Sequence, residues 1–229
     1  MIPWLNKRFP PVEKALSSPN GLLAAGGDLS AARLTDAYQQ GIFPWYNPGE
    51  PILWWSPDPR MVLIPAQFRI STSLHKVLRK AHYQVTFDQA FEQVMRCCAA
   101  PRSGANGTWI NEEIIAAYCE LHRLGHAHSV EVYMNDKLAG GIYGVSLGRM
   151  FYGESMFSHV SNGSKIALAH LAKQLARWQF GMIDCQMSTP HLNSLGAHEI
   201  TRSKFLAHLQ ELIHCEPRTD WQFDADLFK

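Results

Sequence analysis

Two acidic residues fall inside stretches that otherwise look like buried β-strands. Glu154 lies in the aromatic run at 151–157, and Asp184 lies in the short run at 183–186. Burying a carboxylate costs several kcal/mol unless the group is paired or hydrogen-bonded. Carboxylates on core strands are therefore candidates for binding charge or moving protons in a cleft. The alternative interpretation is that each is a structural acid held by backbone donors or an ion pair.

The composition indicates a globular protein without a membrane segment. The chain has 229 residues, of which 46% are hydrophobic and 18% charged, as is ordinary for globular domains. No apolar stretch approaches the ~20 residues that span a bilayer. The first residues lack the basic start and apolar core of a secretory signal. We expect a cytoplasmic protein that does not bind membranes.

Cysteine and histidine usage argues against a disulfide framework or a metal centre. The five cysteines form an odd set without a CxxC pair, so reduced thiols are expected. His126 and His128 would share one face of a strand. No second pair of ligands accompanies them, whereas structural zinc sites use four. We predict no metal.

Positive charge is concentrated in one part of the chain. The formal net charge is +1, but residues 65–110 hold six Lys/Arg and two Asp/Glu, a local balance of +4. Lys76, Arg79 and Lys80 fall on the polar side of a helix predicted at 71–81. A basic surface on a nearly neutral protein predicts a focused anionic partner. The alternative is a solvated helix face.

Two regions with different patterns follow one another. Residues 1–64 are rich in Pro and Gly, which predicts a small, loop-built N-terminal domain with one helix at 30–40 capped by Ser30. Residues 65–229 show regular periodicity. There the predicted order is a helix at 71–81, a strand at 83–87, a helix capped by Asp88, a helix at 111–125, strands at 129–134, 138–146 and 149–156, a helix at 162–179, a strand at 182–187, a helical turn at 191–195 and a helix at 201–214. This is the element order of an α+β, GNAT-like (acyltransferase-type) mixed sheet domain.

Eight short motifs stand in order along the chain. They are Pro19-Asn20-Gly21-Leu22-Leu23, Gly26-Gly27-Asp28-Leu29, Gly41-Ile42-Phe43-Pro44-Trp45, Trp54-Trp55-Ser56-Pro57-Asp58-Pro59-Arg60, Gly107-Thr108-Trp109-Ile110, Gly125-His126-Ala127-His128-Ser129, Gly153-Glu154-Ser155-Met156-Phe157-Ser158 and Asp184-Cys185-Gln186. Together they strongly resemble the bacterial leucyl/phenylalanyl-tRNA–protein transferase family. The resemblance covers residues 19–205.

The resemblance implies a specific reaction. Enzymes of this family move Leu or Phe, and less well Met, from aminoacyl-tRNA to the α-amino group of proteins that begin with Arg or Lys, which marks those proteins for N-end rule degradation. The partners are then the 3′ acceptor ends of Leu-tRNA and Phe-tRNA and the acceptor protein. The aminoacyl-tRNA is a co-substrate, and no cofactor is implied. We expect a monomer.

The resemblance also assigns the catalytic residues. Asp184 would bind and orient the amine or accept its proton. Gln186 is two residues further on, so it faces the same side of the strand and can hydrogen-bond the ester or the attacking group. Glu154 would orient the amine or attract the basic first residue of the acceptor.

Binding residues carry over in the same way. The apolar pocket for the transferred side chain would be lined by Ile142, Phe151, Met156, Leu168 and Ile183, and Ile142 replaces an expected methionine. Trp45 and Trp109 would hold the terminal adenosine, and Lys76, Arg79 and Lys80 would grip the acceptor stem through phosphates. The alternatives are plain core packing for the apolar set and domain-interface packing for the tryptophans.

Three other functions are open to such a chain. One is an acetyl-CoA N-acetyltransferase, which would need a glycine-rich pyrophosphate loop where residues 157–165 have one glycine and no matching pattern. Another is an aminoacyl-tRNA-dependent ligase for a peptide or peptidoglycan, which differs in the acceptor. The third is a non-catalytic tRNA-binding module.

Overall fold

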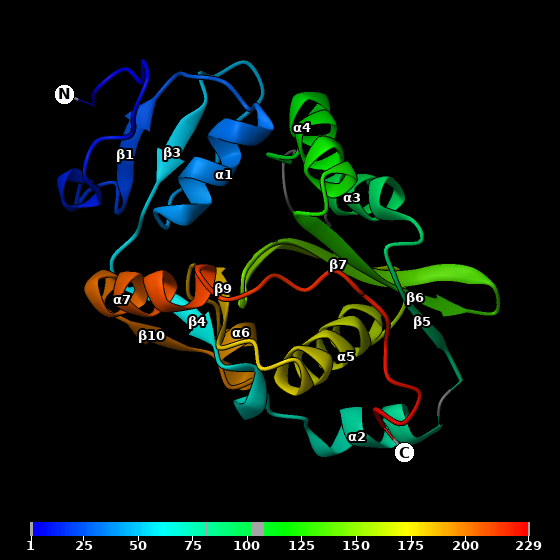
Figure 1. Cartoon of the computed structure of the whole chain (residues 1–229). Coiled ribbons are helices and arrows are strands. Elements are labelled where there is room, and N and C mark those ends of the chain that lie inside the picture. The colour runs from blue at the N-terminus through cyan, green and yellow to red at the C-terminus, as the bar shows by residue number, and fades with distance from the viewer. Residues whose placement is uncertain (1, 81, 102–107, 229) are drawn as a thin grey trace.

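The N-terminal part of the chain forms a small sheet and one helix. In the computed structural model, which describes residues 2–80, 82–101 and 108–228, strands β1 (Leu22–Ala25), β3 (Leu53–Trp55) and β2 (Phe43–Pro44) pair in the order β1-β3-β2 beside α1 (Ala31–Gln39) (Figure 1). The helix expected at 30–40 is confirmed, whereas the three short strands were not expected. These strands are two to four residues long, too short to show a period-2 pattern between the prolines.

The remainder forms a seven-stranded mixed sheet in the order β10-β4-β9-β8-β7-β6-β5. Its strands are β4 (Arg60–Leu63), β5 (Gln84–Phe87), β6 (Ala127–Met134), β7 (Lys137–Leu147), β8 (Met150–Ser158), β9 (Met182–Gln186) and β10 (His198–Ile200). All neighbouring pairs are antiparallel except β8 and β9, which run parallel. The chain passes from β8 to β9 through the crossover helix α5. The predicted order of strands and helices after residue 65 is confirmed except for β10, which was not expected.

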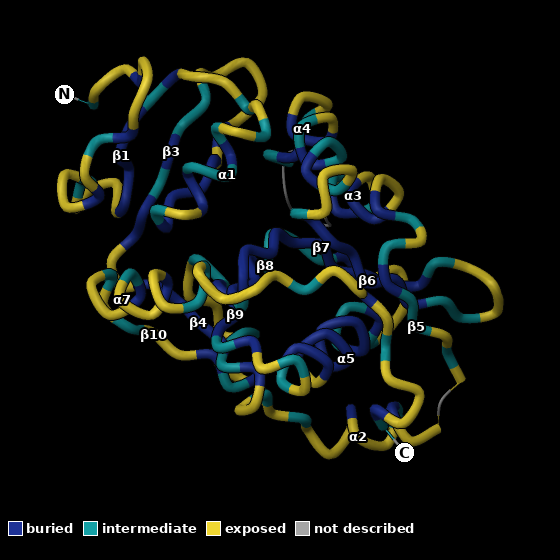
Figure 2. The backbone as a smooth tube through the Cα atoms, viewed as in Figure 1, coloured by how far each residue is buried: buried dark blue, intermediate teal, exposed yellow. Residues whose placement is uncertain are grey.

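Helices cover both faces of the large sheet. They are α2 (Thr72–Lys80), α3 (Phe91–Ala99), α4 (Glu112–Arg123), α5 (Gly163–Arg177), α6 (Pro190–Ser194) and α7 (Arg202–Ile213), with short 3₁₀ turns at Val12–Lys14 and Pro65–Gln67. One apolar core lies between the sheet and α2 and α5, and the other joins the sheet to α1, α3, α4 and α7. Figure 2 shows α5 and the central strands as the most buried elements. None of the described helices is long and apolar enough to cross a membrane.

Strand β4 was not expected, and it affects the division of the chain. It pairs with β9 and β10 inside the large sheet, although it lies before residue 65. A boundary at residue 64 therefore assigns one strand of the large sheet to the small N-terminal unit. The division into units at 1–64 and 65–229 stays a prediction.

The predicted cap at Ser30 is confirmed, and two further helices also begin with a side-chain cap. The side chains of Ser30, Asn111 and Thr201 each accept a hydrogen bond from the backbone of the first helical turn. The prediction that Asp88 caps the next helix was wrong, because α3 begins after Ala90. Asp88 has a positive φ of 58° and directs its carboxylate to β6 instead. Residue 81 at the expected end of the first basic helix, and Gly107 of the tryptophan motif, lie outside the described residues.

Candidate active site

A cavity of about 530 Å³ opens where the two parallel strands separate. The last pair joining β8 to β9 is Tyr152 with Asp184. Glu154 and Gln186 lie two residues further along the chain, and both line the cavity. Gln186 Nε2 donates to Glu154 Oε1 at 3.1 Å.

The cavity wall draws residues from both units of the chain. It is lined by Phe43 and Pro44 of β2, Trp45 directly after it, Trp109 before α4, Ile142 of β7, residues 153–156 of β8, Leu168 of α5, and Ile183, Cys185, Gln186, Met187, Thr189, His191 and Leu192 around β9 and α6. Among these described residues, Glu154 is the only carboxylate. The wall is thus largely apolar with one acid, the composition typical of a ligand pocket.

Glu154 is held by two phenols as well as by Gln186. Tyr38 of α1 donates to Oε1 at 2.7 Å and Tyr118 of α4 donates to Oε2 at 3.3 Å, and the two phenol oxygens lie 2.5 Å apart. Burial of the carboxylate is the main cause that raises the pKa of Glu154 to about 7, against smaller opposing effects of the tyrosine hydrogen bonds.

Asp184 lies behind the cavity rather than in its wall. Its side chain has no exposed surface, and it forms a two-point ion pair with Arg60, from Nε to Oδ1 at 2.8 Å and from Nη2 to Oδ2 at 2.6 Å. Oδ1 also accepts the backbone N–H of Gln186 at 2.9 Å. Both carboxylate oxygens therefore already accept hydrogen bonds from the protein. Among the described residues, Asp184 is not one of those that line the cavity.

Gln186 occupies an unusual backbone conformation. Its φ is +63°, in the left-handed region where residues other than Gly, Asn and Asp are uncommon. Such a conformation persists where surrounding bonds determine it. The hydrogen bond from its backbone N–H to Asp184 is one such restraint, and it turns the side chain toward Glu154.

Four of the five residues predicted for the apolar pocket line this cavity: Ile142, Met156, Leu168 and Ile183. Phe151 does not. Its ring is 1% exposed, and it lies against Gly144 and near Trp221 of the C-terminal segment, 6.2 Å between ring centroids. Phe151 therefore supports the pocket from the layer behind it, which sequence spacing alone does not distinguish from lining it.

The two predicted tryptophans lie at the cavity, whereas the basic residues lie elsewhere. Trp45 and Trp109 both belong to its wall, and Trp45 is 39% exposed. Lys76, Arg79 and Lys80 are exposed on α2 and none of them lines the cavity. The structure thus gathers Glu154, Gln186, four of the five apolar residues and both tryptophans at the cavity, and leaves the basic set on a separate surface.

Sequence reasoning missed Tyr38, Tyr118 and the role of Arg60. Arg60 had an available signal, because a buried acid on a core strand calls for a buried cation and Arg60 ends a motif that is otherwise Trp, Ser, Pro and Asp. The tyrosines gave no comparable signal. Each looks like an ordinary apolar position of an amphipathic helix, and only the packing brings their hydroxyl groups to Glu154.

One group of three possible metal ligands lies away from the cavity. Asp88, His122 and His128 place ligand atoms within 4.8 Å of one another. Their atoms also have protein partners: His128 Nδ1 lies 2.8 Å from Asp88 Oδ2, His122 Nδ1 lies 2.8 Å from the Ala127 carbonyl, and Asp88 Oδ1 accepts the Ser129 N–H. A hydrogen-bonded network explains this group without an ion. His126, the other histidine considered from sequence, is not part of it.

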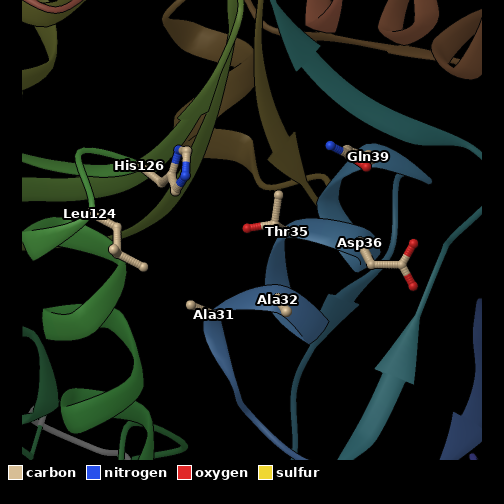
Figure 3. A pocket seen from close by; sticks show the side chains of 7 residues that line it. All are labelled: Ala31, Ala32, Thr35, Asp36, Gln39, Leu124 and His126. Atoms are coloured by element: carbon tan, nitrogen blue, oxygen red, sulfur yellow. The ribbon is translucent and has the colours of Figure 1, made fainter. Parts of the chain in front are cut away.

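A second, smaller hollow lies between α1 and the loop after α4. It measures about 330 Å³ and is lined by Ala31, Ala32, Thr35, Asp36 and Gln39 on one side and Leu124 and His126 on the other (Figure 3). Asp36 lies in this lining, and its carboxylate accepts the side-chain amide of Gln40 at 2.9 Å. The described residues bring no buried acid into this hollow, so the larger cavity is the stronger candidate for chemistry.

The chain is similar to known proteins over nearly its whole length. Two family models match the chain: one described as leucyl/phenylalanyl-tRNA protein transferase at residues 62–210, and one for the N-terminal domain of the same proteins at residues 27–58. A leucyl/phenylalanyl-tRNA–protein transferase of Nitrosospira multiformis is 60% identical over 99% of both chains. Another, of Nitrosomonas europaea, is 61% identical over 94% of this chain and 92% of that one. Among solved structures, L-PGS from Bacillus licheniformis gives a TM-score of 0.39 at 10% identity, over 73% of this chain and 54% of that one.

The raised pKa of Glu154 predicts a pH-dependent contribution to stability. In the folded protein the pKa is about 7 against an ordinary value of 4.5, so between these values the folded state holds more proton than the unfolded state. The free energy of unfolding therefore falls as pH rises through this window, by on the order of 2–3 kcal/mol from this group. E154Q removes the titration. We expect the stability of E154Q relative to wild type to increase from pH 4.5 to 7.5 in urea denaturation, and parallel pH curves for the two proteins would contradict the assignment.

Proposed function

Because this chain belongs to the leucyl/phenylalanyl-tRNA protein transferase family, we propose that it transfers Leu or Phe, and less well Met, from aminoacyl-tRNA to the α-amino group of proteins that begin with Arg or Lys. The products would be marked for N-end rule degradation. The observation that carries the proposal is the cavity itself, whose largely apolar wall contains one carboxylate and two tryptophans.

We also propose a fold family, an oligomeric state and a cellular location for the protein. Strands β6, β7 and β8 in antiparallel order, then α5 and a parallel β9, support a GNAT-like fold for the large unit. We propose that the protein acts as a monomer in the cytoplasm, where its tRNA donors are found, and that aminoacyl-tRNA is its co-substrate without a further cofactor.

The reaction is the aminolysis of an activated ester. The nitrogen of the acceptor attacks the ester carbonyl carbon, the bond from that carbon to the ribose oxygen breaks, and the ribose oxygen takes up a proton. The α-amino group has a reference pKa of about 7.7–8.0, so part of it is neutral near pH 7. Holding amine and ester in contact can then supply most of the acceleration, up to ~7–11 kcal/mol in well-aligned systems.

Glu154 is the group best suited to the amine. Its pKa of about 7 lies within about a unit of an α-ammonium group, so a proton moves from the amine to the carboxylate at low cost. Of the carboxylates considered from sequence, Glu154 lines the cavity and Asp184 does not. We therefore propose Glu154 as the residue that binds the α-amino group and accepts its proton.

Gln186 and Asp184 have different roles in this proposal. Gln186 has its amide in the cavity beside Glu154, and we propose that it hydrogen-bonds the ester or the attacking amine. Asp184 is fully paired with Arg60, and we propose that it acts through Gln186 by fixing its backbone. This is a positioning role, distinct from the direct role that the resemblance allowed.

The other residues of the cavity wall are suited to binding the aminoacyl-tRNA donor. Ile142, Met156, Leu168 and Ile183 form an apolar surface that fits a Leu or Phe side chain, and one methylene changes binding by only ~1–3 kcal/mol, so overlapping preferences are expected. Trp45 and Trp109 can stack on the terminal adenosine. We propose that Lys76, Arg79 and Lys80 bind acceptor-stem phosphates, which position a tRNA without reading its sequence.

The acceptor is the first thing to measure. We expect labelled leucine to pass from Leu-tRNA to a peptide beginning with Arg, and not to a matched peptide beginning with Ala. Transfer to the Arg peptide alone would establish donor, acceptor and reaction together. Binding of Leu-tRNA without any transfer would instead favour a different acceptor, such as a peptidoglycan peptide.

Substituting Glu154 tests its role as proton acceptor. E154Q keeps the size and most hydrogen bonds of the side chain but cannot take a proton. We expect kcat/KM for the Arg peptide to fall by ~10²–10⁴-fold, the usual worth of a positioned acid or base, with KM for Leu-tRNA little changed. The acidic limb of the pH–rate profile near pH 7 should also disappear. A rate within a fewfold of wild type would contradict the role.

Charge removal on α2 tests the tRNA surface. The triple variant K76Q/R79Q/K80Q should bind Leu-tRNA more weakly, and log Kd should depend less steeply on log salt, by up to ~0.9 for each phosphate that the protein no longer neutralises. A control for loss of surface charge is K137Q at the exposed first residue of β7, which should leave the slope unchanged. Equal slopes for wild type and triple variant would show that tRNA does not cross α2.

A further inference from the structure

Trp45 lines the cavity from a segment that has few restraints of its own. It follows a two-residue strand, and its ring is 39% exposed. Its backbone N–H donates to the carbonyl of Leu53 at 2.9 Å. An exposed ring on such a segment provides a stacking surface for a base only if another group holds it in place, because ordering a side chain during binding reduces affinity.

Trp55 supplies that restraint. Its indole Nε1–H donates to the backbone carbonyl of Trp45 at 2.7 Å, and its ring meets the ring of Trp45 edge-on, with centroids 5.5 Å apart and an interplanar angle of 62°. Trp55 is not part of the cavity wall. Any effect of Trp55 on a ligand there is therefore indirect, through wall residues that it contacts, and Trp45 is the one that receives its hydrogen bond.

Trp55 is itself firmly placed. It lies on β3, the central strand of the small sheet, where it faces Leu22 of β1 and Phe43 of β2. The strand thus holds the Trp45 backbone from both sides, through Leu53 at its N–H and Trp55 at its carbonyl. The second tryptophan of the Trp54-Trp55 motif, which the reaction itself does not use, has a defined place in this arrangement.

We infer that Trp55 is a positioning residue for the donor: it fixes Trp45 in the orientation that stacks on the terminal adenosine of aminoacyl-tRNA. The inference rests on the proposed function, in particular on adenosine binding at Trp45. It predicts that loss of the indole N–H weakens donor binding while the chemical step and the acceptor are unaffected.

The adjacent tryptophan offers a matched control. Trp54 projects from the opposite face of the same strand, is fully buried, donates its indole N–H to the Gly26 carbonyl at 2.8 Å and packs edge-on against Phe9. W54F therefore loses the same kind of bond on the same strand, on the side away from Trp45. A purely structural effect of removing an indole should appear in W54F at least as strongly as in W55F.

The experiment measures KM for two donors, Leu-tRNA and the leucyl ester of adenosine, which retains only the terminal nucleoside. W55F should raise KM for both by about three- to tenfold, the usual worth of one hydrogen bond, with kcat within twofold and KM for the Arg peptide unchanged. W54F should lower the melting temperature and leave KM for both donors near wild type. W45A should raise both donor KM values at least as much as W55F.

The outcomes distinguish a failure of this inference from a failure of the proposed function. If W45A raises donor KM and W55F does not, the positioning role is overturned while the proposed function stands. If neither variant changes donor KM, adenosine binding at Trp45 fails and the inference fails with it. If W54F matches W55F in KM, the effect belongs to the small sheet in general, which also overturns the inference.

A second variant at position 55 tests the hydrogen bond even if W55F folds poorly. Incorporation of 3-benzothienylalanine at position 55 keeps the size and shape of the ring and removes only the N–H donor. The same rise in donor KM is expected, without a drop in melting temperature. An unchanged KM in this protein would overturn the role of the hydrogen bond to Trp45.

Discussion

The ion pair between Arg60 and Asp184 is the contact on which the site depends. Arg60 is fully buried and also donates to the Gly41 carbonyl at 3.1 Å, while its guanidinium lies over the rings of Phe43 and Phe205, 4.9 and 4.5 Å from their centroids. One side chain thus joins β4, β9, the entry to β2 and α7. Because removing one partner of such a pair leaves an unpaired buried charge, at a cost of about 3–5 kcal/mol, the two residues constrain each other strongly.

The cavity is a product of both units of the chain. The small N-terminal part contributes Trp45 to the wall and Tyr38 to the hydrogen bonds around Glu154. The large sheet contributes the acid, the amide and the apolar surface. Since Glu154 receives its shortest hydrogen bond from Tyr38, at 2.7 Å, the packing of α1 against the large sheet sets the environment of the carboxylate. The small domain therefore has a direct chemical part in the site.

Sequence patterns predicted the regular elements well and the side-chain environments less well. The long amphipathic helices and the central antiparallel strands repeat their apolar residues often enough to be recognised, whereas β1 to β4 and β10 are two to four residues long and carry no such signal. Asp184 and Glu154 look alike in sequence, each an acid on a core strand. Only the fold reveals that one is neutralised by Arg60 and the other faces the cavity, because the difference depends on residues far away in the chain.

The apolar surface proposed to bind the donor side chain lines the same cavity as Glu154, whose pKa is raised. Burial is the largest cause of the raised pKa of Glu154, and the cavity wall to which it belongs is largely apolar. A carboxylate with its ordinary pKa of 4.5 would be a weak acceptor for the proton of an α-ammonium group. Burial of the carboxylate brings the two pKa values together. Under the proposed function, specificity for an apolar amino acid and activation of the amine would then follow from one physical property of the cavity, its low polarity.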